Sequence, residues 1–268
     1  MTATDTWHLE VDGFSIEGPI RARSYLRALR KGMVEPFMVH LFRQVVKPGM
    51  TILDIGAFLG RYTLLAAQQV GPTGRVYAFE PDPVNFSFLV RNITRNALLD
   101  RVVALPYAVT ERAGVLRFFL DPEEGSGSSL FFHRLREVEE TSVASVALDS
   151  FLEESVVVDV IKLDVEAGEL AALNGMERTL SRGSRHLTMF VECFPRGLWS
   201  AGTTPQTLVT RLENLGFDIL VIDERRKRVH PITPDANFLR YFSLRARFDI
   251  GLHLNLMCVR SLEYPALA

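Results

Sequence analysis

An α/β fold built on a mostly parallel sheet is predicted by three features of this sequence. Short apolar runs rich in β-branched residues alternate with longer stretches that are apolar at helical spacing. The runs end in polar residues, and the stretches between them are long enough for the crossover helices that connect parallel strands. The alternation begins near Met50 and ends at Val259. The sequence therefore predicts one sheet with helices on both faces.

Seven strands and four connecting helices follow from this pattern. The predicted strands are Thr51 to Ile55, Arg75 to Phe79, Val102 to Ala108, Val158 to Asp164, Leu187 to Glu192, Phe217 to Ile222 and Leu254 to Val259. The predicted helices are Tyr62 to Val70, Pro83 to Asn96, Glu169 to Leu180 and Pro205 to Leu215. Thr204 is a good cap for the last helix, with Pro205 at its first position.

Two parts of the chain fall outside the alternation. Residues 1–48 are expected to form an N-terminal cap over the sheet, with a small hairpin at Trp7 to Ile16 and a helix at Val34 to Val46. Residues 49–268 then form the main domain, with a loop insertion at about 114–148. This insertion holds an extra strand at Gly114 to Leu120, the Gly/Ser-rich stretch Gly125 to Ser129 and a charged, helix-like segment from Phe132 to Glu140. Gly/Ser composition beside apolar residues is typical of a loop that closes over a ligand.

Composition excludes several classes of protein and partner. The chain has 268 residues, of which 47% are hydrophobic and 23% are charged, so disorder, collagen and coiled coil are excluded. The formal charge of −2 lacks the basic excess that attracts nucleic acid or anionic lipid, so neither partner is expected. No targeting or membrane segment is visible, and the two cysteines, Cys193 and Cys258, are expected to be reduced and buried. We therefore expect a cytoplasmic protein.

The most informative segment is Leu53 to Gly60, which reads LDIGAFLG where the first strand ends and a helix begins. Gly56 and Gly60 allow the backbone to turn and to approach a ligand closely, and the helix start offers free N–H groups. The spacing differs from the dinucleotide pattern G-x-G-x-x-G, because Asp54 stands at the first glycine position. A carboxylate there repels a pyrophosphate but suits a cationic amine, such as the amino acid end of S-adenosylmethionine (SAM). SAM is therefore favoured over NAD.

A second acid, Glu80, closes the strand Arg75 to Phe79 and is followed by Pro81 and Asp82. Twenty residues separate Glu80 from Gly60, the interval at which a strand-end carboxylate meets the ribose hydroxyls of a nucleoside. The structural alternative is that Glu80 caps the following helix. Together with the glycine motif, nucleoside binding is the stronger interpretation.

The fourth predicted strand ends in the run Ile161 to Glu169, which contains Lys162, Asp164 and Glu166. Ligands of open parallel sheets bind at the carboxyl ends of the strands, beside the point where the strand order reverses. Asp164 and Glu166 would then lie on one rim of the sheet with Asp54 and Glu80. Four neighbouring carboxylates repel one another, so this arrangement is costly without a cation. The sulfonium of SAM supplies one positive charge. Lys162 supplies another if its side chain turns toward the rim, and otherwise it extends along the sheet edge.

Taken together, these motifs resemble the FkbM-type SAM-dependent methyltransferases, from about Glu35 to Glu192. The matching pieces are Leu53 to Thr63, Phe79 to Pro81, Asn92 with Asn96, Ser128 to Leu130, Leu148 with Asp149, and Ile161 to Glu169 continuing to Leu173 and Gly175. The resemblance implies a Rossmann-like class I methyltransferase fold, with a seven-stranded, mostly parallel sheet whose last strand is antiparallel. It also implies SAM as the cofactor and O-methylation of a hydroxyl on a natural product, sugar or related metabolite.

The resemblance further implies roles for individual residues. The residues expected to bind the cofactor are Asp54, Gly56, Ala57, Phe58, Gly60, Tyr62, Thr63, Glu80, Pro81, Asp82, Ala108 and Asp164. The residues expected to contact the acceptor substrate are Ser128, Ser129, His133 and Glu192.

Two positions depart from the family pattern. Phe58 and Leu59 stand where the family usually has Asn followed by a small apolar residue, which would change the packing around the methionine end of SAM. The family's Glu-Gly-x-Glu is Glu166-Ala167-Gly168-Glu169 in this chain, so the glycine moves by one place while both acids stay in register. The acids therefore carry over, and the geometry of the turn stays open.

Methyl transfer to a hydroxyl needs a base that takes the proton while the oxygen attacks in line with the C–S bond. Glu166 and Asp164 are the two candidates for the catalytic base, and the sequence does not choose between them. Each has a structural alternative, since Asp164 would also suit the cofactor or a loop amide and Glu166 would also cap a helix. Glu192 and His133 are weaker candidates for the base. No metal is expected, although Asp164, Glu166 and Glu192 together would also suit Mg²⁺.

Other functions stay open as alternatives. Methylation of nitrogen on an amine or amide needs no base if the acceptor arrives neutral. A SAM-binding sensor or scaffold is a different class, and a dinucleotide oxidoreductase is disfavoured by the glycine spacing. We expect a small-molecule acceptor, and the sequence indicates no oligomeric state.

The remaining features have structural interpretations. The run Glu224 to Arg228 is expected to be a charged hairpin tip rather than a clamp for phosphate or an acidic substrate. His40 is expected to pack within an apolar helix face, and the aromatic segment Phe238 to Phe248 is expected to pack on the sheet rather than to form a substrate wall.

Overall fold

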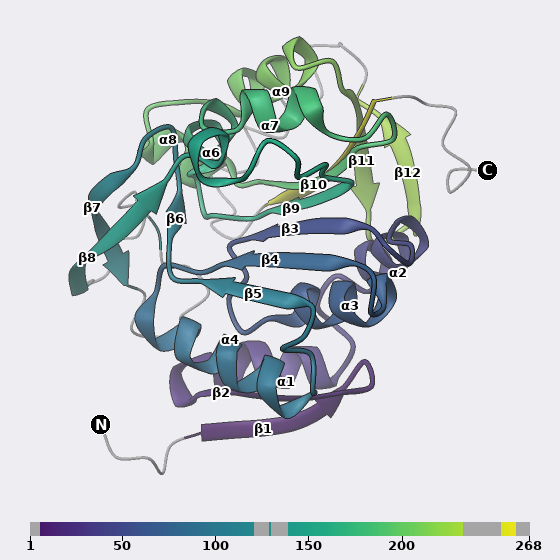
Figure 1. Ribbon diagram of the computed structural model, residues 1–268, viewed down its shortest axis with the longest axis vertical. Coiled ribbons are helices and arrows are strands. Elements are labelled where there is room, and N and C mark those ends of the chain that lie inside the picture. The colour runs from purple at the N-terminus through teal and green to yellow at the C-terminus, as the bar shows by residue number, and fades with distance from the viewer. Residues whose placement is uncertain (1–5, 121–128, 130–138, 233–252, 261–268) are drawn as a thin grey trace.

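The computed structural model describes residues 6–120, 129, 139–232 and 253–260. An eight-stranded sheet crosses the molecule in the order β12-β11-β13-β10-β9-β3-β4-β5 (Figure 1). Its strands are β3 (Thr51–Ile55), β4 (Arg75–Phe79), β5 (Val102–Leu105), β9 (Val160–Leu163), β10 (Thr188–Cys193), β11 (Asp218–Asp223), β12 (Arg228–Pro231) and β13 (Leu254–Val259).

The order of the strands reverses beside β3. This strand pairs in parallel with β4 on one side and with β9 on the other, and β9 pairs in parallel with β10. The last strand, β13, inserts antiparallel between β10 and β11. This is the Rossmann-like arrangement that the sequence predicts. The predicted count of seven is short by one, because the chain turns back at the predicted hairpin tip and adds β12 as an antiparallel edge strand.

The helices lie on both faces of the sheet. They are α1 (Arg23–Arg30), α2 (Pro36–Val45), α3 (Arg61–Val70), α4 (Pro83–Arg95), α5 (Leu148–Phe151), α6 (Glu169–Asn174), α7 (Glu177–Arg182), α8 (Pro195–Ser200) and α9 (Pro205–Asn214), with a 3-10 turn at Ile20–Ala22. The strands outside the main sheet are β1 (Thr6–Val11), β2 (Phe14–Pro19), β6 (Ala108–Val109), β7 (Gly114–Leu120) and β8 (Glu139–Val146).

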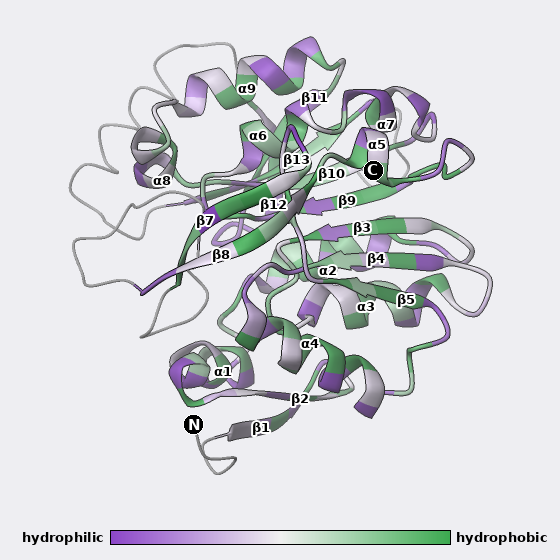
Figure 2. Ribbon diagram, turned by 60° about the vertical axis from the view of Figure 1, so that its left-hand side comes forward, coloured by the Kyte–Doolittle hydropathy of each residue, from purple (hydrophilic) through white to green (hydrophobic). Residues whose placement is uncertain are grey.

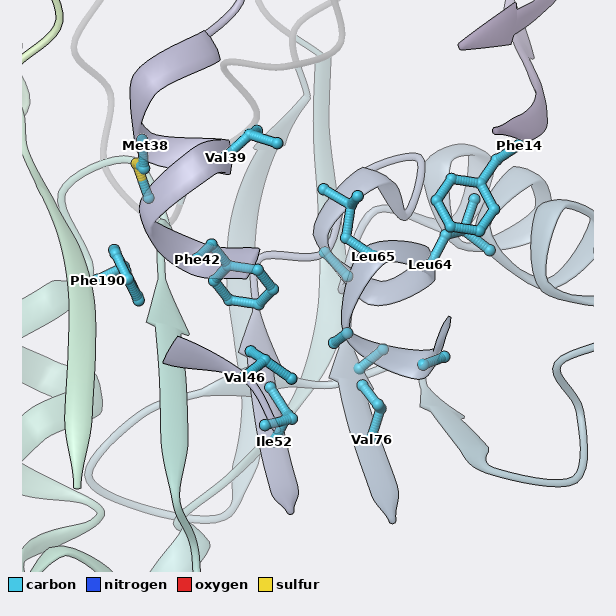
Figure 3. Close-up of a cluster of buried hydrophobic side chains, with 14 of the residues drawn as sticks. Phe14, Met38, Val39, Phe42, Val46, Ile52, Leu64, Leu65, Val76 and Phe190 are labelled. Carbon is cyan, nitrogen blue, oxygen red and sulfur yellow. The ribbon is translucent and has the colours of Figure 1, made fainter. Parts of the chain in front are cut away.

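Alternate residues of each main strand face two hydrophobic cores on opposite sides of the sheet. Ile52 and Phe190 face the first core, under α1 to α4, whereas Leu53 and Met189 face the second core, under α5 to α9. Figure 2 shows that β3, β4 and β5 are largely hydrophobic, and that α9 carries hydrophilic segments. In the first core, Phe42 of α2 packs beside Phe190 with the ring centroids 5.5 Å apart (Figure 3).

The N-terminal hairpin is present as β1 and β2, and it lies against α4 rather than over the sheet (Figure 1). Asn92 of α4 is fully buried, accepts a hydrogen bond from the Glu17 N–H at 2.8 Å and donates to the Glu17 carbonyl at 2.9 Å. Asn96 repeats this pattern with Ser15. The two asparagines therefore hold β2 as a neighbouring strand would, through side-chain amides instead of backbone groups.

The insertion supplies β7 and β8, which form a separate three-stranded sheet with the preceding β6 in the order β6-β8-β7, and β7 is the predicted extra strand. The predicted strand Val102 to Ala108 divides between the two sheets, because Pro106 has no N–H for the ladder. Glu139 and Glu140 begin β8, so the predicted helix-like segment is wrong at its end. The rest of that segment lies outside the described residues, as do Ser128, His133 and residues 238–248.

The predicted helix Glu169 to Leu180 is two helices, α6 and α7. Gly175 lies between them, and a Cβ at this position would come within 1.9 Å of the Thr110 carbonyl oxygen. This close backbone contact with Thr110, directly after β6, requires glycine at the position between the two helices. In the parts of the chain that the structure describes, no helix is both long and apolar enough to cross a membrane.

Candidate active site

A cavity of about 490 Å³ opens at the carboxyl ends of β3, β4, β9 and β10. It lies beside β3, where the strand order reverses, which is where open α/β sheets bind their ligands. Its volume suits a small molecule or cofactor. Tyr25 and Glu35 from the N-terminal segment and Asn255 from β13 also line it. The wall therefore combines segments that are far apart in the sequence.

The glycine turn after β3 runs against the end of β9. Gly56 has a φ of +84°, and a Cβ there would lie 1.8 Å from the Asp164 carbonyl oxygen. Gly60 has a φ of +90° and stands at the N-cap of α3, where a Cβ would lie 2.6 Å from Leu89 Cδ1. Gly56 therefore requires glycine for the backbone angle and for the space, and Gly60 requires it for the backbone angle.

Phe58 and Leu59, the first departure from the family pattern, fill different spaces. Phe58 takes a left-handed backbone conformation with φ +51°, and its ring packs edge-on against Tyr25 with centroids 5.0 Å apart. Both rings line the cavity. Leu59 is buried in the first core. The bulkier pair therefore alters the cavity wall only through Phe58.

Asp54 is buried at the end of β3 and lines the cavity. Its Oδ2 accepts a hydrogen bond from the Thr63 hydroxyl at 2.5 Å. Burial disfavours the carboxylate and raises the pKa of Asp54 to about 6, although the Thr63 hydrogen bond opposes this shift. Thr63 is buried away from the cavity, so it supports Asp54 rather than meeting a ligand.

Glu80 joins the two turns that frame the cavity. Its Oε2 accepts a hydrogen bond from the Phe58 N–H at 2.8 Å, and its Oε1 accepts one from the Asp82 N–H at 2.9 Å. Burial, together with the nearby Asp82 charge, raises the pKa of Glu80 to about 8. Glu80 therefore lies on the cavity wall with its charged form disfavoured.

Asp82, in contrast, has a structural position. Its Oδ1 accepts a hydrogen bond from the Val84 N–H at 2.8 Å, which caps α4, and its Oδ2 pairs with Arg21 at 2.8 Å. Its side chain is fully buried and does not line the cavity. The residue that caps α4 is therefore Asp82 and not Glu80, for which capping was the structural alternative.

Lys162 turns toward the cavity, on the same sheet face as its register partner Asp54. Its side chain is almost fully buried, its Nζ lies 2.6 Å from Asp164 Oδ2, and the ammonium stands 5.1 Å from the centre of the Tyr62 ring. Burial lowers the pKa of Lys162, but the neighbouring carboxylates outweigh it and raise the value above its usual range. Burial likewise opposes ionisation of Asp164, but the Lys162 charge lowers its pKa. The two groups therefore form a partly buried ion pair on the cavity wall, with Lys162 buried and Asp164 half-buried.

Glu192 and Asn255 face each other on β10 and β13. They are directly opposite in the antiparallel register, and both line the cavity. Among the described residues that line it, these two carry a buried side-chain oxygen without a hydrogen-bond partner, Glu192 Oε2 and Asn255 Oδ1. Burial, and after it the Asp164 charge, raises the pKa of Glu192 well above its usual value. The neutral form of Glu192 is therefore favoured over the carboxylate.

Glu35 links the N-terminal segment to this end of the cavity. Its Oε1 accepts a hydrogen bond from Asn255 Nδ2 at 2.6 Å, and its Oε2 accepts one from the Tyr62 hydroxyl at 2.9 Å. Burial, and after it the Glu35 charge, raises the pKa of Tyr62 well above its usual value, so the hydroxyl stays a donor. The motifs do not include Glu35 and Asn255 among the site residues. The available signal was the start of the resemblance at Glu35, directly before the helix-starting Pro36.

The turn after β9 contains the second departure from the family pattern, the alanine in place of the family's glycine. Glu166 and Ala167 have φ values of +51° and +87°, so alanine stands in the left-handed conformation at the place of the family's glycine. Glu169 Oε1 accepts hydrogen bonds from the Val165 and Ala167 N–H groups, each at 3.2 Å. Burial raises the pKa of Glu169 to about 7. Glu166 lines the cavity and Glu169 does not, so the two acids hold different positions.

The remaining residues that the sequence predicts for the site also divide into those that line the cavity and those that do not. Ala57, Pro81 and Ala108 line the cavity. Ser129 lies outside the wall, and its hydroxyl donates a hydrogen bond to the Glu166 carbonyl. In the part of the chain that the structure describes, no group of three His, Cys, Asp or Glu side chains is arranged to hold a metal ion.

The chain matches the family model for the methyltransferase FkbM domain over residues 54–219. This match begins at Asp54, ends in β11 and includes more than half of the chain.

Two curated relatives and one solved structure are similar to this chain. The hexuronic acid methyltransferase AglP from Haloferax volcanii is 24% identical over 173 residues, which are 64% of this chain and 68% of AglP. The 31-O-demethyl-FK506 methyltransferase FkbM from Streptomyces tacrolimicus is 37% identical over 78 residues, 29% of each protein. The structure of a SAM-dependent O-methyltransferase from Thermotoga maritima aligns with a TM-score of 0.46 and 14% identity, over 86% of this chain and 65% of that one.

The strand order, the glycine turn against Asp164 directly after β9, and the family match agree with one another. The chain belongs to the FkbM methyltransferase domain family and is a SAM-dependent methyltransferase with a class I, Rossmann-like fold.

Proposed function

We propose that this enzyme transfers the methyl group of SAM to a hydroxyl group of a small molecule such as a sugar, a natural product or a related metabolite. The observation that carries the proposal is the ion pair of Lys162 and Asp164 on the cavity wall, 2.6 Å apart. A hydroxyl nucleophile gains negative charge as it loses its proton. The carboxylate of Asp164 accepts that proton, and the ammonium of Lys162 stabilises the developing charge.

The residues around the glycine turn suit SAM. Asp54 and Glu80 are buried acids whose charged forms are disfavoured by burial, and a ligand with an ammonium group and ribose hydroxyls would satisfy both. Gly56 leaves space where any side chain would meet the end of β9. When bound, SAM supplies an electrophilic methyl group on its sulfonium. Asp54 would hold the amino acid end, and Glu80 would hold the ribose.

Between the two candidates for the catalytic base, we favour Asp164. Lys162 orients its carboxylate and keeps it ionised, so it is ready to accept a proton. Glu166 also lines the cavity and stays the alternative base, but it belongs to a strained turn, with a backbone φ of +51°. A low pKa makes Asp164 a weak base, so proton transfer accompanies formation of the C–O bond rather than preceding it.

The acceptor class is supported by the relatives and by charge. The names of AglP and FkbM give a hexuronic acid and a 31-O-demethyl compound, which are small molecules with hydroxyl groups. The formal charge of −2 disfavours nucleic acid as the acceptor. A protonated amine beside Lys162 would be repelled, which disfavours N-methylation.

Cys193 and Cys258 are free and buried, as suits the reducing cytoplasm.

We further propose that residues 1–48 select the acceptor and that residues 49–268 form the methyltransferase domain with its insertion at about 114–148. Tyr25 and Glu35 bring the first segment to the cavity wall.

The test is incubation of the protein with methyl-labelled SAM and a metabolite extract, followed by mass spectrometry of the labelled products. We expect label in a methyl group on oxygen, in the presence and in the absence of a chelator. A product labelled on nitrogen would contradict O-methylation. Tight binding of S-adenosylhomocysteine (SAH) without any labelled product would indicate a sensor, and loss of label with chelator would indicate a required divalent ion.

A further inference from the structure

The β10–β13 end of the cavity carries two oxygens that the methyl-transfer step does not use. Glu192 Oε2 and Asn255 Oδ1 are buried, and neither has a hydrogen-bond partner in the described ranges of the chain. An unpaired buried oxygen is costly, so native structures contain few of them. The two residues stand directly opposite each other on neighbouring strands, where side chains on one face are in reach of the same group. Their coincidence at one end of the cavity points to a ligand.

The orientation of the Asn255 amide is set by its neighbours. Its Nδ2 donates to Glu35 Oε1 at 2.6 Å, and the other oxygen of Glu35 accepts from the Tyr62 hydroxyl at 2.9 Å. Rotating the amide by half a turn would place its oxygen against the Glu35 carboxylate, which has no hydrogen to offer. The unpaired atom of Asn255 is therefore an acceptor, and it calls for a hydrogen-bond donor.

The reacting end of the cavity lies next to this pair. Lys162 is in register with Phe190, two residues before Glu192 on the adjacent strand, so Lys162 and Glu192 project from the same face of the sheet. An acceptor with one oxygen at Lys162 and Asp164 would present its next polar group to Glu192 and Asn255. A hydrogen-bond donor suits this place, since the unpaired Asn255 Oδ1 is an acceptor.

We propose that Glu192 and Asn255 form a recognition subsite for a second hydroxyl group of the acceptor, next to the hydroxyl that is methylated. The acceptor is therefore a polyhydroxylated molecule with two neighbouring hydroxyl groups. This inference rests on the proposed function, because it describes a group on the substrate of the same reaction.

The test compares two probes that differ by one hydroxyl group, trans-cyclohexane-1,2-diol and cyclohexanol. Each is titrated into the SAH-saturated protein by calorimetry. A site built to bind a hydroxyl strongly rejects an analogue without it, so we expect the diol to bind at least about tenfold more tightly. Equal affinity of the two probes, or no binding of either up to its solubility limit, would overturn the proposal.

Variants of Asn255 test whether this residue is responsible for the preference for the diol over cyclohexanol. Asn255→Leu is expected to remove the preference for the diol while SAH affinity stays unchanged, and Asn255→Ser is expected to retain part of it. The matched control is Asn214→Leu, because Asn214 is an exposed residue at the end of α9. If Asn255→Leu fails to fold after Glu35 loses its partner, the wild-type comparison and Asn255→Ser still decide the outcome. A full preference in Asn255→Leu would show that another residue reads the second hydroxyl.

The two proposals fail in different ways. A protein that transfers label to extract metabolites but binds both probes equally is a methyltransferase without this subsite. A protein that prefers the diol but labels no hydroxyl keeps the subsite and loses the proposed reaction.

Discussion

The carbonyl oxygen of Asp164 occupies the space that a side chain on Gly56 would need. A Cβ built on Gly56 lies 1.8 Å from that oxygen. The approach follows from the parallel pairing of β3 with β9, whose last bond runs from the Asp164 N–H to the Ile55 carbonyl at 3.0 Å. One contact therefore sets both the glycine turn and the position of the residue that we favour as the base.

Gly56→Ala is expected to destabilise the fold by about 3 kcal/mol or more, because the backbone angle and the overlap with Asp164 both oppose it. Gly216→Ala is the matched control, since Gly216 has the same φ of +84° with nothing within 4 Å of its Cβ. We expect the control to cost about 1–2 kcal/mol, from the backbone angle alone. Urea denaturation measures both. Equal losses in the two variants would show that the Asp164 contact is not what requires glycine.

Ala167→Gly is expected to stabilise the protein by roughly 1 kcal/mol, because Ala167 has a φ of +87° that glycine adopts freely. The control is Ala171→Gly inside α6, which makes the same chemical change in a helical residue and is expected to destabilise by about 1 kcal/mol. Thermal unfolding distinguishes the two signs. A loss of stability in Ala167→Gly would mean that the methyl group of this buried alanine contributes more than its backbone strain costs.

The stability of the ligand-free protein is expected to fall as pH rises from about 5 to 8. In the folded chain the pKa of Glu80 is raised to about 8, against 4.5 without the fold, so the folded state holds a proton that the unfolded chain has released. One such group contributes at most about 1.4 kcal/mol per pH unit. Asp54 and Glu169, with pKa values of about 6 and 7, act in the same direction.

Glu80→Gln is therefore expected to flatten this pH dependence, whereas Glu213→Gln, at an exposed position on α9, is expected to leave it unchanged. Denaturation series at several pH values give the slopes. An unaltered slope in Glu80→Gln would contradict the raised pKa.

Lys162→Met is expected to lower kcat by about 100-fold or more, because the acceptor oxygen loses its cation and Asp164 loses its orienting partner. SAH affinity is expected to change by less than about threefold, a difference worth well under 1 kcal/mol. The control is Lys227→Met in the exposed turn between β11 and β12. Turnover by Lys162→Met at the wild-type rate would remove Lys162 from the mechanism.

Asp54→Ala and Glu80→Ala are each expected to weaken SAH binding by about tenfold or more, since each removes a charge-assisted contact to the cofactor. Asp223→Ala, at the end of β11 and away from the cavity wall, is the control. Calorimetry with SAH gives the affinities. Unchanged affinity in both site variants would contradict the assignment of the cofactor to this turn.

Local patterns predicted the strands best where turn residues flank an apolar run. The predicted bounds of Thr51–Ile55, Arg75–Phe79 and Leu254–Val259 are the observed ones. The sequence predicts the hairpin that contains β12 but not a strand of the sheet there, because Arg228–Pro231 is not an apolar run and lies at an edge. Gly175, between α6 and α7, lies against the backbone of Thr110, and no local pattern contains this contact.

The site was predictable to the extent that its residues are continuous in the sequence. Asp54, Gly56 and Glu80 belong to strand-end motifs, and all three line the cavity. Asp82 fits the same motif but caps α4 and pairs with Arg21, because a helix N-terminus and a buried guanidinium both attract a carboxylate. Asn255 could not be found from a motif, since only the antiparallel insertion of β13 brings it beside Glu192.

Glu35 and Asn255 are joined by a hydrogen bond. Both lie outside residues 54–219, the part of the chain that matches the family. A change at either end of the chain can therefore alter which acceptor fits while the cofactor motif stays intact. Enzymes of this family with the same signature can thus diverge in substrate, and a chimera that exchanges only the segments before residue 54 and after residue 219 should transfer acceptor preference from one member to another.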